Sequence, residues 1–148
     1  MNVCHICGIP WDAGVFDQSD IQTAPEPGQE VILARFDLHP NYCGTLLYFA
    51  QFTDLYARDP SQVSTPGYQW QIRNNGSPLD PYLAFDYIIN PWGMAGFPVQ
   101  MRLSEGAHLE LVIRNVGGTD AVQLKQVGGR LVGRYWYNTD FGGAPNKL

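Results

Sequence analysis

The cysteines near the N-terminus are the residues whose spacing most directly suggests chemistry. Cys4 and Cys7 are separated by two residues, a spacing that lets two thiolates share one Zn²⁺ ion, and Cys43 could supply a third ligand. The sequence has no second CxxC and no HxxxH pair to complete such a site. Three cysteines are also too few for a disulfide framework. We therefore expect ordinary thiols and no resident cofactor, with structural zinc at Cys4 and Cys7 as the alternative.

The histidines and carboxylates form no catalytic pattern. The histidines, His5, His39 and His108, are far apart and fall in predicted loops or turns. No GxSxG elbow or other nucleophile signature accompanies them. Four aspartates could pair for glycoside hydrolysis, but their neighbours mark them as solvated turn or strand-end residues: Asp54, Asp59, Asp80 and Asp86. The sequence predicts a protein that is not an enzyme.

Aromatic residues are the best candidates for contact with a partner. They make up 13% of the chain, and in Tyr135-Trp136-Tyr137 the alternation of a strand turns at least one ring away from the core. Outward rings at this density indicate an interface, with protein favoured over glycan. Trp92, in a loop between Pro91 and Gly93, is a further candidate. The predicted interface residues are Trp11, Phe16, Trp92, Tyr135, Trp136 and Tyr137.

Charge and hydropathy narrow the range of partners. The net charge of −5, without a local Lys/Arg cluster, predicts no direct binding to nucleic acid. No apolar run approaches the roughly 20 residues that a membrane-spanning helix needs. The N-terminus lacks the charged start and apolar stretch of a secretory signal, so we expect synthesis in a cytoplasm.

Residues 1–29 differ from the rest of the chain and are predicted to form an irregular, extended arm and linker. They show neither a helical nor a strand period, and they end in the stiff, proline-containing segment 24–28. Trp11 and Phe16 should keep the arm from floating free in water. It either folds back on its own domain or reaches a neighbouring subunit. We expect residues 1–27 to be separable from a β-sandwich domain over residues 30–148.

From Glu30 onward, apolar residues alternate in short segments between turn residues. This pattern predicts an antiparallel all-β sandwich of jelly-roll type with about eight strands. Asn75-Gly76 predicts a tight turn, since both residues tolerate positive φ. Two hairpins are expected, one over residues 97–114 and one over 121–137 with its turn at Gly128-Gly129. The predicted strands are 30–37, 44–56, 68–73, 82–89, 97–103, 108–114, 121–127 and 130–137.

Short motifs in this region resemble a known group of proteins. Val31-Ile32-Leu33-Ala34-Arg35-Phe36 is followed by Trp70-Gln71-Ile72-Arg73, then by Asn75-Gly76-Ser77-Pro78. Ser104-Glu105-Gly106 then precedes a strand from Leu109 to Asn115. In this order they resemble small β-sandwich proteins from the structural gene clusters of tailed bacteriophages, over residues 30–137.

The resemblance implies a virion structural protein, either a capsid decoration (cement) protein or a head–tail or tail-associated component. Its partner would be a capsid or other virion protein, reached through the arm and the exposed aromatics. It would act in the virion, as a homo-oligomer, with a trimer favoured because closed symmetric rings suit symmetric sites. The resemblance transfers no catalytic residue. The alternative is a lectin-like, carbohydrate-binding module for host attachment, with Trp92 or Trp136 contacting the glycan.

Overall fold

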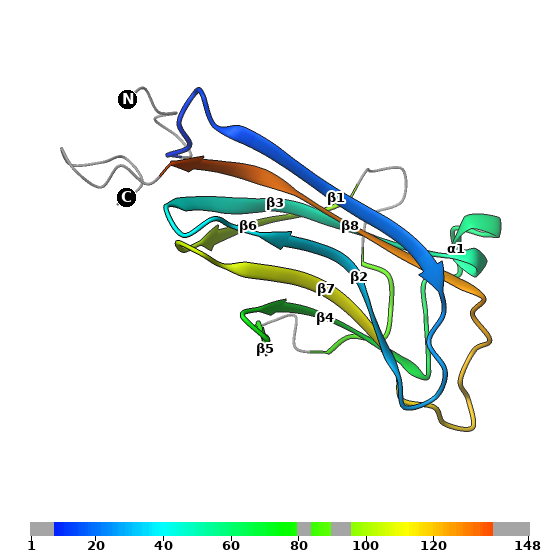
Figure 1. The fold of residues 1–148 in the computed structure, drawn as a ribbon. Coiled ribbons are helices and arrows are strands. Elements are labelled where there is room, and N and C mark those ends of the chain that lie inside the picture. The colour runs from blue at the N-terminus through cyan, green and yellow to red at the C-terminus, as the bar shows by residue number, and fades with distance from the viewer. Residues whose placement is uncertain (1–7, 80–83, 90–95, 138–148) are drawn as a thin grey trace.

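The computed structural model describes residues 8–79, 84–89 and 96–137, which form two four-stranded antiparallel sheets packed face to face (Figure 1). The first sheet has the order β1 (Gly14–Thr23), β8 (Gln126–Tyr137), β3 (Tyr42–Thr53) and β6 (Phe97–Leu103). The second has the order β2 (Glu30–Asp37), β7 (His108–Asn115), β4 (Tyr68–Asn74) and β5 (Ser77–Pro78). One short helix, α1 (Asp54–Arg58), follows β3. The predicted all-β sandwich is confirmed.

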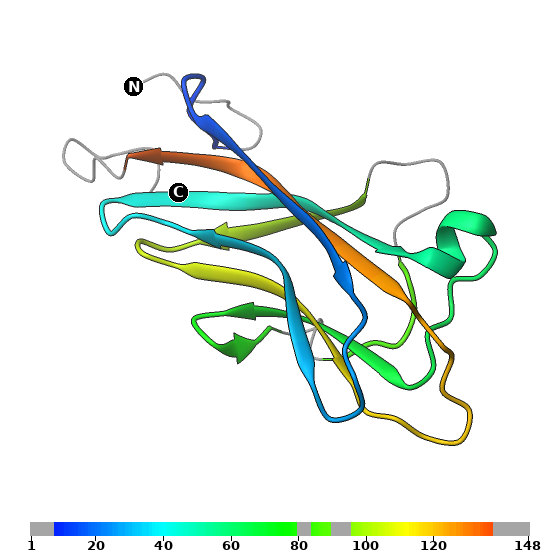
Figure 2. The ribbon, with the colours of Figure 1, turned by 45° about the vertical axis from the view of Figure 1, so that its right-hand side comes forward.

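The strand pairing is nested. β1 pairs with β8, β2 with β7, β3 with β6, and β4 with β5. The ladders β3–β8 and β4–β7 then complete the two sheets. As a result, strands that follow one another in the chain often lie in opposite sheets, as β1 and β2 do (Figure 2).

The nested pairing shows that the predicted hairpin over residues 97–114 is wrong. Both of its strands exist, as β6 and β7, but β6 pairs with β3 while β7 pairs with β2 and β4. The turn between them crosses from one sheet to the other, and Ala107 in this turn accepts a hydrogen bond from the Leu38 amide (2.9 Å). Alternation identified the two strands but carries no information about their partners.

The predicted hairpin over residues 121–137 is also wrong, because β8 runs unbroken through Gly128 and Gly129. Both glycines lie in the middle of the first sheet, between β1 and β3. A Cβ at Gly129 would lie 2.6 Å from Leu111 Cδ2 of the opposite sheet. At this position glycine is required because the two sheets pack closely, and not because a turn needs a positive φ angle.

The N-terminal segment corrects the expectation of an irregular arm, since residues 14–23 form the edge strand β1. All ten residues pair with β8, from Gly14 opposite Tyr135 to Thr23 opposite Gln126. Phe16 is the one buried side chain of β1, so the strand shows little of the alternation that marks half-buried strands. The arm folds back on its own sandwich, and a cut after residue 27 would remove a strand from the first sheet.

Other element boundaries differ from the prediction more locally. β3 ends at Thr53, whose Oγ1 accepts a hydrogen bond from the Tyr56 amide (3.0 Å) and caps α1. Residues 84–89 make only isolated bridges, Phe85 to Trp70 and Tyr87 to Ser64, in place of the expected strand over 82–89, and residues 80–83 lie outside the described part. The Asn75-Gly76 turn is confirmed by φ angles of 54° and 83°.

Candidate binding surfaces

The structure separates the six predicted interface residues into three groups. Trp11 (68% exposed) and Tyr137 are on the surface, and Tyr135 is half-buried. Phe16 (3% exposed) and Trp136 (4% exposed) are buried within this chain. Trp92 lies outside the described residues. An interface role stays a prediction for Trp11, Tyr135 and Tyr137, whereas Phe16 and Trp136 are corrected to packing residues.

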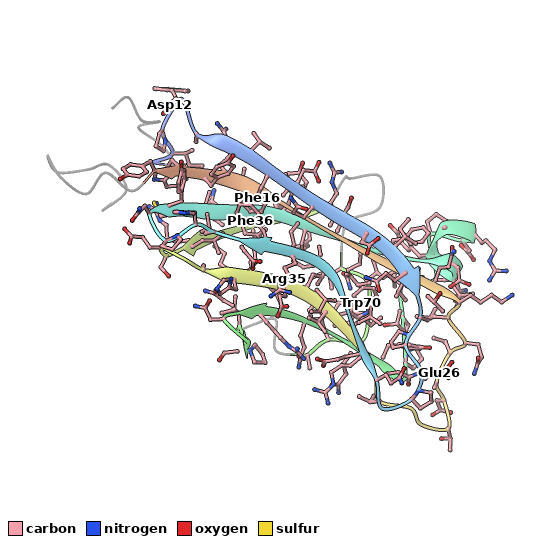
Figure 3. The ribbon with its side chains drawn as sticks, in the orientation of Figure 1. Asp12, Phe16, Glu26, Arg35, Phe36 and Trp70 are labelled. Atoms are coloured by element: carbon pink, nitrogen blue, oxygen red, sulfur yellow. The ribbon has the colours of Figure 1, made fainter. Side chains whose placement is uncertain are left out.

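Phe16 and Trp136 are buried for different reasons. Phe16 stacks on Phe36 with ring centroids 3.9 Å apart, and so joins β1 of the first sheet to β2 of the second (Figure 3). Trp136 points to the outer face of the first sheet, but Ala13 in the segment before β1 packs over it. The Arg102 guanidinium lies 5.8 Å from its ring centroid. Alternation could not reveal that another segment covers an outward-facing ring.

Aromatic side chains gather at the end of the sandwich where β1 and β3 begin and β2 and β8 end. The β3–β8 register places Tyr42 opposite Tyr137, and their ring centroids are 5.6 Å apart. Tyr135 lies 5.9 Å from Tyr42 and 5.8 Å from Phe36. A hollow of about 270 Å³, which we call the tyrosine pocket, is lined by Phe36, Asp37, Leu38, His39, Tyr42 and Tyr135.

Asp37 follows Phe36 in β2, and its carboxylate lies on the outer face of the second sheet, where it contacts His108 and Arg35. Its Oδ1 lies 2.8 Å from His108 Nδ1 and accepts a longer bond from Arg35 Nε (3.4 Å). The contact with His108, and secondarily the charge of Arg35, lower the pKa of Asp37 against the opposing effect of burial. The carboxylate of Asp37 therefore favours its ionised form at this end of β2.

The lowered pKa of Asp37 predicts a pH-dependent contribution to stability. A carboxyl whose pKa is lower in the folded than in the unfolded state stabilises the fold above its ordinary pKa of 3.8, and this contribution disappears as the pH falls through the folded value. Asp37→Asn should therefore lower the melting temperature slightly at about pH 5, by less than ~1 kcal/mol because both partners are well exposed. The difference should shrink as the pH falls and vanish once the pH is below the pKa of Asp37 in the folded protein, so a difference that does not change with pH would contradict this role.

The outer face of the first sheet carries exposed apolar side chains. Val15 and Ile21 (59% exposed) point outward from β1, since Phe16 between them points inward. Gly128 of β8 lies between Ile21 of β1 and Phe52 of β3. Two apolar side chains therefore flank a glycine, which has no side chain to fill the space between them. The result is a hollow of about 570 Å³, the Gly128 hollow, lined by Ser19, Asp20, Ile21, Ala50, Gln51, Phe52, Gly128, Gly129 and Arg130.

The outer face of the second sheet carries several ion pairs, whereas the first carries the pair Asp17–Arg130 among the described residues. Arg73 donates to both carboxylate oxygens of Glu30, at 3.0 and 2.8 Å. These bonds lower the pKa of Glu30 and raise that of Arg73, mainly through the hydrogen bonds themselves. Arg35 lies 4.0 Å from Glu110, and Asp37 connects this pair to His108. Opposite charges cover this face, so it is well suited to remain in water.

Three further findings concern metals, membranes and relatives. Over the part of the chain that the structure describes, no group of three His, Cys, Asp or Glu side chains could hold a metal ion. Cys43 is buried beside Trp136, while Cys4 and Cys7 lie outside the described residues, so the zinc alternative stays a prediction. No helix among the described residues is long and apolar enough to cross a membrane. Neither the comparison with protein-family models nor the search of curated proteins found a match.

Proposed function

We propose that the chain is a non-enzymatic virion structural protein, a capsid decoration protein or a head–tail or tail-associated component that acts as a homo-oligomer. The resemblance to bacteriophage structural proteins motivates the proposal. The fold supports it through the nested pairing of first with last strand, which is the order expected when a long hairpin rolls into a jelly roll. Jelly rolls are frequent in viral shells, but a fold alone does not define a function.

The observation that carries the proposal is the chemical difference between the two outer faces. Val15 and Ile21 expose apolar surface on the first sheet, next to the Gly128 hollow. Trp11, which is also exposed, lies in the turn that precedes β1. Among the described residues, the outer face of the first sheet carries one ion pair, Asp17–Arg130, whereas the outer face of the second sheet carries several. An exposed apolar patch of this kind is typical of a surface that docks on a shell or on another copy of the same protein.

Ile21→Glu is expected to abolish docking of the protein without unfolding it. The side chain is mostly in water in the single chain, so a carboxylate costs little there, but it would be buried without a partner in an interface. The wild-type protein should co-sediment with virions of the virus that encodes it and form oligomers in analytical ultracentrifugation. Ile21→Glu should be monomeric and should stay in the supernatant.

Ile32→Glu is the matched control, since Ile32 (37% exposed) is also an isoleucine in an edge strand but points outward from the second sheet. It should sediment and assemble like the wild type. Circular dichroism of both variants checks that they are folded. Docking lost equally in both variants would contradict the assignment of the face, and absence of the chain from purified virions would overturn the virion function itself.

A further inference from the structure

We propose that the free edge of β1 pairs with β1 of a second copy, so that two first sheets join into one antiparallel sheet about a two-fold axis. β1 ends the strand order of the first sheet, and no strand pairs with its other edge in the part of the chain that the structure describes (Figure 1). Such an edge presents unpaired amides and carbonyls that can bind another strand. The inference rests on the homo-oligomer part of the proposed function and names the contact between the copies. Both Gly128 hollows would lie on one side of the joined sheet.

Of the four sheet edges that the described residues form, β1 has the fewest features that prevent pairing. The edge strand β6 contains Pro98, while β5 is two residues long and contains Pro78. The pairing of the edge strand β2 shifts between Ile32 and Ala34, and the Ile32 carbonyl accepts a hydrogen bond from Gln22 Nε2 (2.7 Å). Prolines, bulges and short strands are the usual features that keep an edge unpaired. β1 has ten residues in unbroken register with β8 and contains no Pro, Lys or Arg.

The amides that face the free edge of β1 belong to its odd-numbered residues. The Asp20 carbonyl oxygen lies toward β8, since a Cβ on Gly128 would come within 3.1 Å of it. The Ile21 amide instead donates to the Asp20 carboxylate (2.9 Å). Because alternate residues of an antiparallel strand bond to the same neighbour, Ser19 and Asp17 also present their amides at the free edge. A second strand can therefore bind along this edge without breaking the β1–β8 ladder.

The side chains of β1 are self-complementary about Gln18. A two-fold axis perpendicular to the sheet keeps the outer faces of both copies on one side, so outward residues must lie opposite outward residues. With the axis at Gln18, Val15 of each copy lies opposite Ile21 of the other, and Asp17 lies opposite Ser19 and not opposite another carboxylate. An axis at Ser19 would place Asp17 opposite Ile21. Apolar cross-strand pairs favour the register about Gln18.

Asp20 is the group that competes with this pairing. Its Oδ1 accepts the hydrogen bond from the Ile21 amide, and its Oδ2 accepts one from Gln22 Nε2 (2.9 Å). A carbonyl of the second copy needs the same Ile21 amide, so the Asp20 carboxylate must turn away when the strands pair. Asp17, the other carboxylate of β1, is paired with Arg130 (2.6 Å) on the outer face and needs no such movement. Removal of the Asp20 carboxylate should therefore strengthen the dimer.

Analytical ultracentrifugation of the full chain, without virions, measures the dimer directly. Ser19→Pro removes an amide from the free edge, where proline is tolerated, and the two-fold axis doubles the loss. It should raise the dissociation constant of the dimer about thirtyfold or more. The matched control Ser19→Ala keeps the amide and should dimerise like the wild type. Asp20→Ala should lower the dissociation constant at least about fivefold.

Disulfide trapping tests the register without a proline. In a chain that carries Cys4→Ser and Cys7→Ser, Gln18→Cys places two Cα atoms about 4.5 Å apart at the axis, within the reach of a disulfide. Oxidation with diamide should link the two copies covalently. Thr23→Cys is the control, since Thr23 is exposed in the same strand like Gln18, but its two copies would lie roughly 33 Å apart. It should form no covalent dimer.

The outcomes separate this inference from the virion function. The inference is overturned if the wild type is a monomer or a trimer, if folded Ser19→Pro dimerises like the wild type, or if Thr23→Cys is trapped as well as Gln18→Cys. If circular dichroism shows that Ser19→Pro is unfolded, the cysteine variants decide. A dimer of a chain that is absent from virions would refute the virion function alone. A wild-type monomer that co-sediments with virions would refute the strand pairing alone.

Discussion

Phe16→Ala is expected to destabilise the protein by about 3–5 kcal/mol, the usual cost of removing a buried phenylalanine ring. Phe16 is 3% exposed and stacks on Phe36 at 3.9 Å with an angle of 8° between the rings. The substitution leaves a cavity between the two sheets and removes the main aromatic contact that fixes β1 to β2. Since a domain of this size is stable by only about 5–15 kcal/mol, chemical denaturation should show a large drop in midpoint.

Val15→Ala is the control for this experiment. Val15 is the neighbouring residue of the same strand, but it points to the outer face and is largely in water. It should change the stability by less than about 0.5 kcal/mol, as surface substitutions usually do. If Phe16→Ala were as mild as Val15→Ala, β1 would not be part of the folded sandwich, and residues 1–29 would form the separable arm that the sequence suggests.

Gly133→Ala is expected to destabilise the protein by about 3 kcal/mol, at the upper end of overpacking effects. Gly133 lies opposite Phe16 in the β1–β8 ladder and opposite Leu46 in the β3–β8 ladder. An added Cβ would clash with the Thr45 carbonyl oxygen and with the Phe16 ring. A ring can turn away, but the carbonyl belongs to the ladder of β3, so the sheet backbone itself must shift.

Gly128→Ala provides the comparison within the same strand. A Cβ at Gly128 would lie 3.1 Å from Ile21 Cγ1 and 3.2 Å from Phe52 Cδ1, and small movements of these two side chains relieve the contacts. It would also lie 3.1 Å from the Asp20 carbonyl oxygen, a milder contact than the clash with the Thr45 carbonyl at Gly133. We expect a loss well below that of Gly133→Ala in thermal denaturation. Equal losses at both positions would mean that any side chain in the middle of β8 is harmful, and that the carbonyl clash is not the cause.

The sequence predicted the strands better than their arrangement. β2, β6 and β7 agree with the predicted ranges to within one residue, because their alternation reports which residues face a core. The Asn75-Gly76 turn was predictable since two positive φ angles require such residues. The pairing of the strands was not predictable, because a nested sandwich joins strands that are far apart in the chain. The residues of a single strand do not specify its partner.

The glycines of β8 show a second limit of prediction from sequence. Gly128-Gly129 predicts a turn because glycine is common in turns, yet here it permits close packing: Gly129 lies under Leu111 of the other sheet. Only the partner across the sandwich distinguishes the two uses of glycine. β1 was not predicted as a strand because it is an edge strand with one buried side chain, so its sequence shows almost no alternation of apolar and polar residues.

The candidate site was predictable only in part. The triplet Tyr135-Trp136-Tyr137 drew attention to the end of β8, and the structure does place Tyr135 and Tyr137 near the tyrosine pocket. Asp37, His39 and Tyr42 were not singled out, although His39-Pro40-Asn41 marks the turn that brings them there. Tyr42 comes near Tyr135 through the β3–β8 register, while Asp37 and His39 come from the end of β2 and the turn after it, an arrangement that the sequence does not reveal.

The position of β8 between β1 and β3 has a consequence for biosynthesis. While a ribosome makes the chain, β1 and β3 have emerged long before their shared neighbour, and each β1 residue waits for a partner more than 100 residues later. Local contacts cannot complete the first sheet in the meantime, and folds dominated by such distant contacts form in milliseconds to seconds. The outer face with Ile21 and Phe52 is therefore assembled last, after translation of β8, so that any contact made through this face must form on the finished sheet.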